Sequence, residues 1–144
     1  MIGDEIHCLR NVGPVQLRKA NSYCQSLNAN QILPTSRQES DDLVSALLSL
    51  KLSSEDGKKL VSIGIYKTKK GEWYDFTGQL ISYFNWLPGE PDDIRGNLNY
   101  AKLRTDEVNG TAGWADYSGS DELNLICTKI AGQGNTNSRF NNKY

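Results

Sequence analysis

The spacing of apolar residues changes once along this chain, and the change restricts the folds that the chain can adopt. Before about residue 59, apolar residues recur at intervals of three and four, as they do on one face of a helix. After it, they stand in short runs that are rich in β-branched and aromatic residues and are separated by turns. Helices followed by several short strands predict an α+β domain with an antiparallel sheet.

Two helices are expected in the first third of the chain. The first carries one apolar stripe, which consists of Leu17, Ala20, Cys24 and Leu27. Cys24 is therefore expected on the buried face of this helix. The second helix begins after Pro34 with a capping box, Ser36-Arg37-Gln38-Glu39, and presents a broad apolar face over residues 43–50.

The second half of the chain is predicted to be β-rich and to belong to the same domain. Strands are predicted at residues 60–66, 72–76, 83–86, 98–103 and 123–129. With 144 residues, no internal repeat and no long linker, the chain is one domain that can bury a core without metals. We place this domain at residues 1–130, and we expect the polar remainder, residues 131–144, to be a disordered tail.

Charge and hydropathy exclude several classes of partner. The 16 basic and 17 acidic residues give a net charge of −1, which provides no basic surface for nucleic acid. The lysine runs at residues 58–59 and 67–70 are expected to be solvated turns. No apolar run approaches about 18 residues, so no membrane insertion is expected. Because no signal peptide opens the chain, it is expected to be either cytosolic or a mature secreted domain.

The three cysteines, Cys8, Cys24 and Cys127, allow more than one arrangement. In a secreted protein, an odd number leaves one thiol free or paired with another molecule. Their spacing does not show which two would pair, and it contains no Cys-x-x-Cys metal or redox motif. Three reduced, buried cysteines in a cytosolic protein are the alternative.

An unusual acidic loop follows the predicted strand at residues 83–86. The loop is rich in Pro and Gly and carries Glu90, Asp92 and Asp93. Neighbouring carboxylates repel one another unless solvent, a cation or a hydroxyl-rich ligand lies among them. A second motif, Gly113-Trp114-Ala115-Asp116, follows later in the chain. The loop is therefore either a solvated acidic turn or a binding site.

These two motifs, in this order, resemble the sugar-binding region of C-type lectin domains. There, a Glu-Pro-Asn or Gln-Pro-Asp triplet follows an Asn-Trp pair, and a later Trp-Asn-Asp completes the site. The resemblance runs from about residue 8 to residue 129. It implies a C-type lectin-like fold, with two helices packed on short antiparallel sheets and a long ligand-binding loop. It also implies a disulfide between Cys24 and Cys127, and it leaves Cys8 as a candidate for an intermolecular bridge in a homodimer.

The resemblance further implies a calcium site. Glu90, Asp92 and Asp116 match three of the family's calcium ligands, and Pro91 matches a proline that is cis in the family. Two ligand positions are lost: Asn97 or Leu98 stands where a Glu is expected, and Ala115 stands where an Asn is expected. Any calcium is therefore expected to bind weakly, with a Kd of about 10⁻⁴–10⁻³ M. The Glu-Pro-Asp triplet matches neither the mannose-type nor the galactose-type sequence, so it selects no sugar.

The residues expected to contact carbohydrate are Glu90, Asp92, Asp93, Asn97, Trp114 and Asp116. Trp114 would either stack on a sugar or serve as a buried anchor, and Trp86 is expected in the core. A second disulfide of the family is missing, because its positions hold Tyr100 and a residue near Ser118.

The leading hypothesis is a secreted, extracellular carbohydrate-binding protein whose partners are glycans or glycoproteins. The alternative is a module that binds protein without calcium. An enzyme is not expected, because His7 is the only histidine. A glycosidase that uses a carboxylate pair such as Glu90 with Asp116 is the minor alternative. Asn109-Gly110-Thr111 is a sequon, so Asn109 is a predicted glycosylation site.

Overall fold

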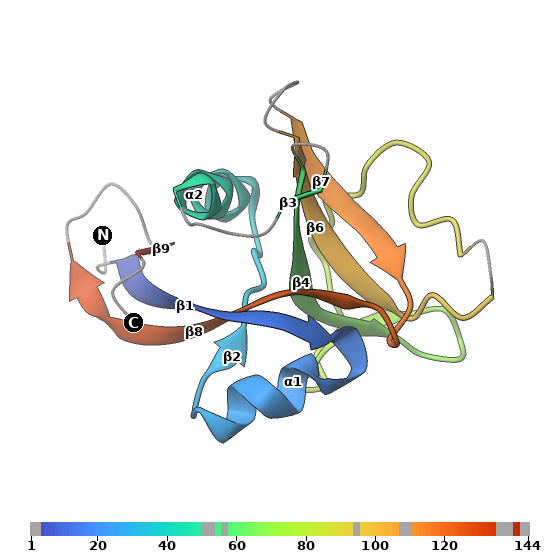
Figure 1. The fold of residues 1–144 in the computed structure, drawn as a ribbon, viewed down its shortest axis with the longest axis horizontal. Helices are drawn as coiled ribbons and strands as arrows, with labels where there is room; N and C mark the ends of the chain where they lie inside the picture. Colours follow the sequence, from blue (N-terminus) through green and yellow to red (C-terminus); the bar gives the residue numbers. More distant parts are fainter. Residues whose placement is uncertain are drawn as a thin grey trace.

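The chain forms a mixed sheet with two helices (Figure 1). The computed structural model describes residues 4–49, 54–55, 58–93, 96–106, 111–134 and 140–141. The helices are α1 (Leu17–Ser26) and α2 (Arg37–Leu48). The described strands are β1 (Asp4–Gln16), β2 (Asn30–Gln31), β3 (Ser54–Glu55), β4 (Lys58–Lys67), β5 (Trp73–Asp75), β6 (Tyr100–Asp106), β7 (Thr111–Tyr117), β8 (Glu122–Gly134) and β9 (Phe140–Asn141).

The sheet has the strand order β7-β6-β4-β8-β1-β9, with β2 paired to β8 and with β3 and β5 paired to β4. Most pairs are antiparallel, as predicted, but β4 with β8 and β1 with β9 are parallel. The α+β prediction is confirmed, and the two parallel pairs make the sheet mixed. β4 and β8 meet at one residue pair, Val61 with Asn124, where the long β1–β8 pair joins the upright strands β4, β6 and β7.

The alternation of side chains along β8 separates two packed clusters. Ile126 points into the larger cluster, which includes Leu43 and Leu47 of α2. Its neighbours Leu125 and Cys127 point to the other face, against α1. Figure 1 accordingly shows the two helices on opposite sides of the β1–β8 pair.

The disulfide implied by the resemblance is present in the smaller cluster. Cys24 of α1 and Cys127 of β8 are bonded, with their Cα atoms 5.5 Å apart. As the apolar stripe predicted, Cys24 lies on the buried face of its helix. The bond ties α1 to a central strand across a separation of 103 residues.

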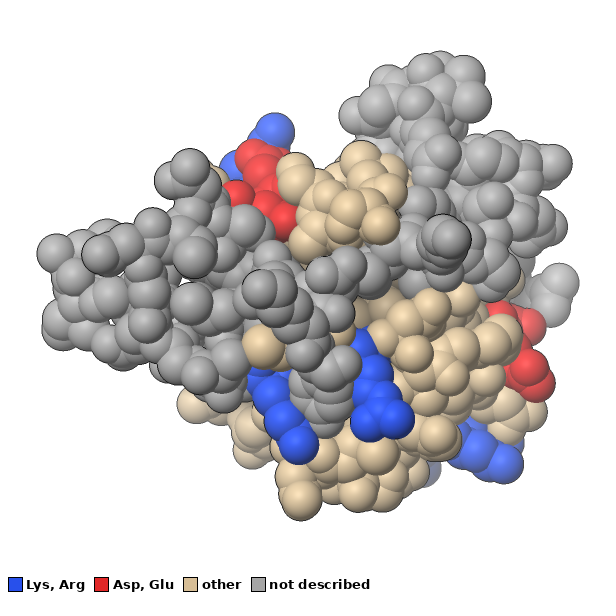
Figure 2. All heavy atoms as spheres, turned by 60° about the vertical axis from the view of Figure 1, so that its left-hand side comes forward, with Lys and Arg blue, Asp and Glu red and all other residues tan. Residues whose placement is uncertain are grey.

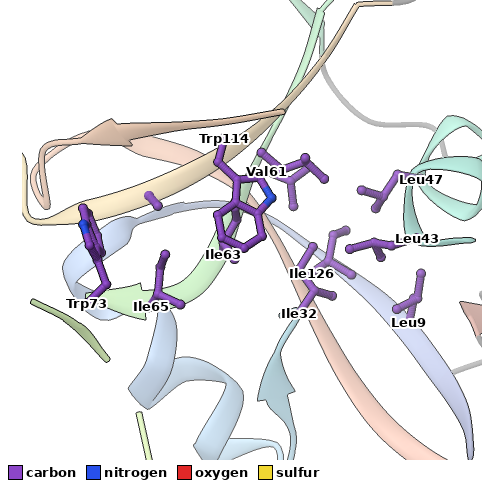
Figure 3. Close-up of a cluster of buried hydrophobic side chains, with 12 residues drawn as sticks. Leu9, Ile32, Leu43, Leu47, Val61, Ile63, Ile65, Trp73, Trp114 and Ile126 are labelled. Carbon is purple, nitrogen blue, oxygen red and sulfur yellow. The ribbon is translucent and has the colours of Figure 1, made fainter. Parts of the chain in front are cut away.

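Trp114 of β7 lies in the middle of the larger cluster and is 0% exposed. Figure 3 shows its indole between Trp73 and the leucines of α2. Its ring also meets that of Trp86 edge to face, with centroids 5.9 Å apart. Trp114 therefore lies at the centre of the larger cluster. Trp86 packs against this cluster, as predicted.

Both helices begin where the sequence places them, by different means. Ser36 caps α2 by accepting a hydrogen bond from the Glu39 N–H at 3.1 Å, while the Glu39 carboxylate accepts from Thr35 N–H at 3.1 Å. The N-cap of α1 makes no side-chain bond. Instead, the first backbone N–H groups of α1 donate to carbonyls of residues 119 and 121, so this helix starts on the turn before β8.

Two sequence predictions about strands are wrong. Residues 83–86 form no strand; Trp86 makes only an isolated bridge with Trp114. The tail predicted to be disordered contributes residues 131–134 to β8 and Phe140–Asn141 to β9. Strand pairing uses backbone groups, so a polar sequence can join a ladder without apolar side chains. The boundary at residue 130 stays a prediction.

The described surface carries a mixture of charges. On the face drawn in Figure 2, lysine and arginine side chains stand at separate places, and at the upper left they adjoin acidic side chains. Within the described part of the chain, no helix is long and apolar enough to span a membrane.

Candidate functional site

The acidic loop lies along β7, beside the β6–β7 pair (Figure 1). Trp114 N–H donates to Asn85 O at 2.8 Å, and Leu87 N–H donates to Trp114 O at 2.8 Å. Gly113 makes this close approach possible, because a Cβ at that position would lie 2.7 Å from Leu87 Cδ2. The loop is thus attached to β7 directly before its acidic residues.

Asp116 holds the acidic part of the loop in place. The residue is 4% exposed, and its two carboxylate oxygens accept from the backbone N–H groups of Asp92 at 3.2 Å and Asp93 at 2.8 Å. The peptide bond between Glu90 and Pro91 is cis, as the resemblance implied. Asp116 therefore has a structural role in addition to any ligand that it binds.

Three predicted ligands come together. Glu90, Asp92 and Asp116 each offer a carboxylate oxygen, and these oxygens all lie within 4.8 Å of one another. The pKa of Glu90 is raised from 4.5 to about 7 by burial, by its hydrogen bond to Asp116 and by the charges of Asp92 and Asp116. The crowded carboxylates therefore favour a proton or a cation between them.

This arrangement fits a calcium ion. Calcium lies about 2.3–2.6 Å from its oxygen ligands, so two oxygens on one ion lie at most about 5 Å apart. Glu90, Asp92 and Asp116 would hold the ion. Leu98, which lines the hollow beside the carboxylates, and Ala115 have no side-chain oxygen. The remaining ligands would have to be backbone carbonyls, water or a bound hydroxyl compound.

Asp93 and Asn97 are placed differently from these three. Lys67 Nζ lies 3.0 Å from one Asp93 oxygen, and Leu98 N–H donates to the other at 3.0 Å. The Leu98 N–H first, and then Lys67, lower the pKa of Asp93. Asp93 also has a φ of 43°, so it shapes the turn. Asn97 is exposed and is not among the residues that line the hollow beside the three carboxylates.

Trp114 does not offer a face to a sugar. Its complete burial contradicts the predicted stacking contact and agrees with the alternative that it is a buried anchor. The residue acts on the site through its backbone, which bonds the loop at two points.

Sequence reasoning missed several residues around the three carboxylates. They share an open hollow of about 330 Å³ with Lys102, Arg104, Tyr117 and Asp121. Lys102 Nζ lies 3.7 Å from the centre of the Tyr117 ring. Along β6, the buried side chains of Ala101, Leu103 and Thr105 alternate with two basic residues. This alternation is the sequence pattern that predicts an outward orientation for Lys102 and Arg104.

The region of the missing second disulfide is packed by an aromatic ring. A Cβ on Gly119 would lie 2.7 Å from Tyr100 Cε2, so the ring covers the turn before β8. Cys8 is a half-buried free thiol on β1. Asn109 lies outside the described residues.

Comparisons with known proteins agree with this fold. The sequence model of the lectin C-type domain matches residues 14–129. Comparison with curated protein sequences finds no significant match.

Similar solved structures include the C-type lectin domain of murine dendritic cell inhibitory receptor 2 in complex with N-glycan. It is 19% identical, with a TM-score of 0.69 over 87% of this chain and 91% of that one. CEL-I from Cucumaria echinata is 22% identical, with a TM-score of 0.64 over 89% and 91%. The carbohydrate-recognition domain of cow CD23, solved in the presence of GlcNAc2Man3 oligosaccharide, is 22% identical, with a TM-score of 0.64 over 89% of each chain. Because the family model covers most of the sequence, this chain belongs to the C-type lectin domain family.

Proposed function

We propose that this domain is an extracellular glycan-binding module whose site is formed by Glu90, Asp92 and Asp116. The observation that carries the proposal is the grouping of their three carboxylates within 4.8 Å, next to an open hollow. Binding is proposed rather than catalysis, because Asp116, which a catalytic pair with Glu90 would need, is buried and uses both of its oxygens to accept backbone N–H groups of the loop.

A weakly held calcium ion is part of this proposal. When bound, calcium would supply coordination positions that neighbouring sugar hydroxyls can fill. Asp92 is exposed and Glu90 is half-buried, so both can reach a ligand in the hollow. Their oxygens would also accept hydrogen bonds from the sugar hydroxyls, while buried Asp116 keeps the loop in position.

Glycans or glycoproteins are the proposed partners, outside the cell. Structures of similar fold were solved with an N-glycan and with a GlcNAc2Man3 oligosaccharide. The Cys24–Cys127 disulfide supports an oxidising compartment. A homodimer through the free thiol of Cys8 stays a prediction; it would strengthen weak binding by presenting two sites.

The second candidate is a module that binds a protein without calcium. It is favoured by Leu98 and Ala115, which leave the ion short of side-chain ligands, and by Lys102 and Arg104, which line the same hollow. This mixed-charge surface suits a polar protein contact.

Thermal unfolding in about 10 mM calcium, compared with excess chelator, tests the proposal. A site with a Kd of about 10⁻⁴ M adds about 2.7 kcal/mol, which raises the Tm by about 5–10 °C. Glu90→Gln should abolish the shift. Asp121→Asn is the matched control, because Asp121 lines the hollow but lies outside the three-carboxylate group, and it should keep the shift.

Binding of a GlcNAc2Man3 oligosaccharide, with calcium and with chelator, then separates the two candidates. Calcium-dependent binding that Glu90→Gln removes supports the lectin site. A protein partner whose binding survives chelator and sugar competition supports the second candidate. Sugar binding that is unchanged in Glu90→Gln would place the sugar elsewhere and contradict the proposed site.

A further inference from the structure

A row of three aromatic rings lies on the β4–β5 hairpin, in a part of the molecule that the acidic site does not use. Tyr66 of β4 and Tyr74 of β5 are cross-strand partners with stacked rings, whose centroids are 6.2 Å apart. Phe76 extends the row, with its ring centroid 5.0 Å from that of Tyr66. Both tyrosines are half-buried, and Phe76 is 37% exposed, so the row is accessible to a ligand.

Phe76 is held in place although it lies beyond the end of β5. The carboxylate of Asp75 accepts from Thr77 N–H at 2.8 Å, from the Thr77 hydroxyl at 2.6 Å and from Gln79 N–H at 3.0 Å. These bonds close the turn that carries Phe76. A fixed aromatic ring loses little conformational freedom when it binds a partner.

Two lysines stand beside the tyrosine end of the row. Lys69 and Lys70 are exposed and share with Tyr66 and Tyr74 a hollow of about 430 Å³. This volume lies in the range of about 300–1,000 Å³ that is usual for small-ligand sites. Among the described residues, neither lysine forms an ion pair, whereas Lys67 is bonded to Asp93. With Glu72 as the one acidic residue at this hollow, its net charge is positive.

The other end of the row is lined by several amides and by the carboxylate of Asp75. Phe76 borders a second hollow, of about 170 Å³, to which Asn21, Gln25, Asn30 and Gln31 contribute. Amide groups donate and accept hydrogen bonds, as hydroxyl groups require. The row therefore connects a hollow of net positive charge, which can hold the anionic groups of a chain, with a polar hollow whose amides can bind its hydroxyls.

We infer that this row is a second binding surface, which takes an anionic polysaccharide chain. The aromatic rings match the flat C–H faces of sugar rings, the lysines match sulfate or carboxylate groups, and the amides match free hydroxyls. The charge of the lysine hollow selects against a neutral chain. This surface needs neither calcium nor the acidic loop, so it is independent of the proposed function.

Binding to immobilised chondroitin sulfate, with chelator present and over a range of salt concentrations, tests the inference. The native protein should bind, and its affinity should fall as salt rises. Lys69→Ala/Lys70→Ala should weaken binding about tenfold and reduce the dependence on salt. Phe76→Ser should weaken it about two- to tenfold without unfolding the domain, because its ring is partly exposed.

The matched control is Lys19→Ala/Arg37→Ala, which removes two exposed positive charges from the helices. It should leave binding unchanged; a loss equal to that of the hairpin variant would overturn the inference. Competition by two further polymers identifies the anionic group that is bound. Hyaluronan carries carboxylates without sulfates, so it should compete only if carboxylates suffice. Dextran is uncharged and should not compete. Failure of both anionic polymers to bind, or self-association that Phe76→Ser abolishes, would also overturn it.

Discussion

Asp116 illustrates how one side chain can serve both the fold and the site. Its carboxylate contributes an oxygen to the three-carboxylate group and also accepts the backbone N–H groups of Asp92 and Asp93. Asp116 is 4% exposed, so water cannot readily replace a hydrogen bond that is lost there. Both carboxylate oxygens are therefore needed to hold the loop. An amide at this position has only one accepting oxygen for the two backbone N–H groups.

Asp116→Asn should lower the free energy of unfolding by about 1–3 kcal/mol, even without calcium. The substituted amide has one accepting oxygen, so its NH₂ group would face either the Asp92 or the Asp93 N–H. Urea unfolding in chelator measures the loss, and the calcium-dependent rise in Tm should disappear as well. Asp121→Asn serves again as the control; equal stability of the two variants would show that Asp116 does not hold the loop.

At the scale of elements, the loop is positioned by its contact with β7. The contact depends on Gly113, where the space for a side chain is taken by Leu87 and where Asn85 O would lie 3.2 Å from an added Cβ. Three residues after Leu87 comes Glu90, whose N–H donates to Leu87 O at 2.9 Å. A displacement of Leu87 is thus passed directly to a predicted ligand.

Gly113→Ala should move the loop away from β7, weaken calcium binding and destabilise the domain by about 1–3 kcal/mol. The added methyl group would overlap Leu87, and the backbone of Asn85 limits how far the segment can yield. Leu87→Ala should partly restore stability in the Gly113→Ala background, since it removes the overlapping atoms. Chemical unfolding of both single variants and the double variant measures this coupling. Additive losses would contradict the overlap.

Some elements could be predicted from local pattern and others could not. The apolar stripe of α1 and the cap of α2 are local signals, and both predictions are confirmed. β1 was missed because Gly13 and Pro14 look like a turn, whereas Gly13, at a φ of 98°, lies at an irregularity within a continuing strand. β7 was missed because Gly113 interrupts its strand-like pattern. The glycine is needed there because Leu87 occupies the space of a side chain, and this contact cannot be read from the local sequence.

The candidate site, too, could be predicted only in part. Glu90, Asp92 and Asp116 could be found from the two motifs, and the structure brings them together. Lys102 and Arg104 could not be assigned to the site, because their place depends on the pairing of β6 with β7. Sequence shows which face a strand residue occupies, but only strand pairing shows what lies beside it.

At the scale of the whole molecule, the acidic site should make stability depend on pH. The pKa of Glu90 in the folded protein is about 7, against an ordinary 4.5, so the folded state holds this proton more tightly than the unfolded state. The stability that this proton provides is complete below about pH 4.5 and is lost as the pH rises through about 7. Asp93 affects stability in the opposite direction, because its pKa is lowered in the folded protein. Its contribution to stability is present above its ordinary pKa and is lost as the pH falls through its folded-state pKa.

Glu90→Gln isolates this contribution, because it removes the titrating group and keeps the shape of the side chain. Without calcium, the variant should gain stability relative to the native protein between about pH 5 and pH 8, since only the native protein loses a stabilising proton there. Melting temperatures in chelator across this range measure the difference. A constant difference for Glu90→Gln would mean that its carboxyl is not crowded by Asp92 and Asp116.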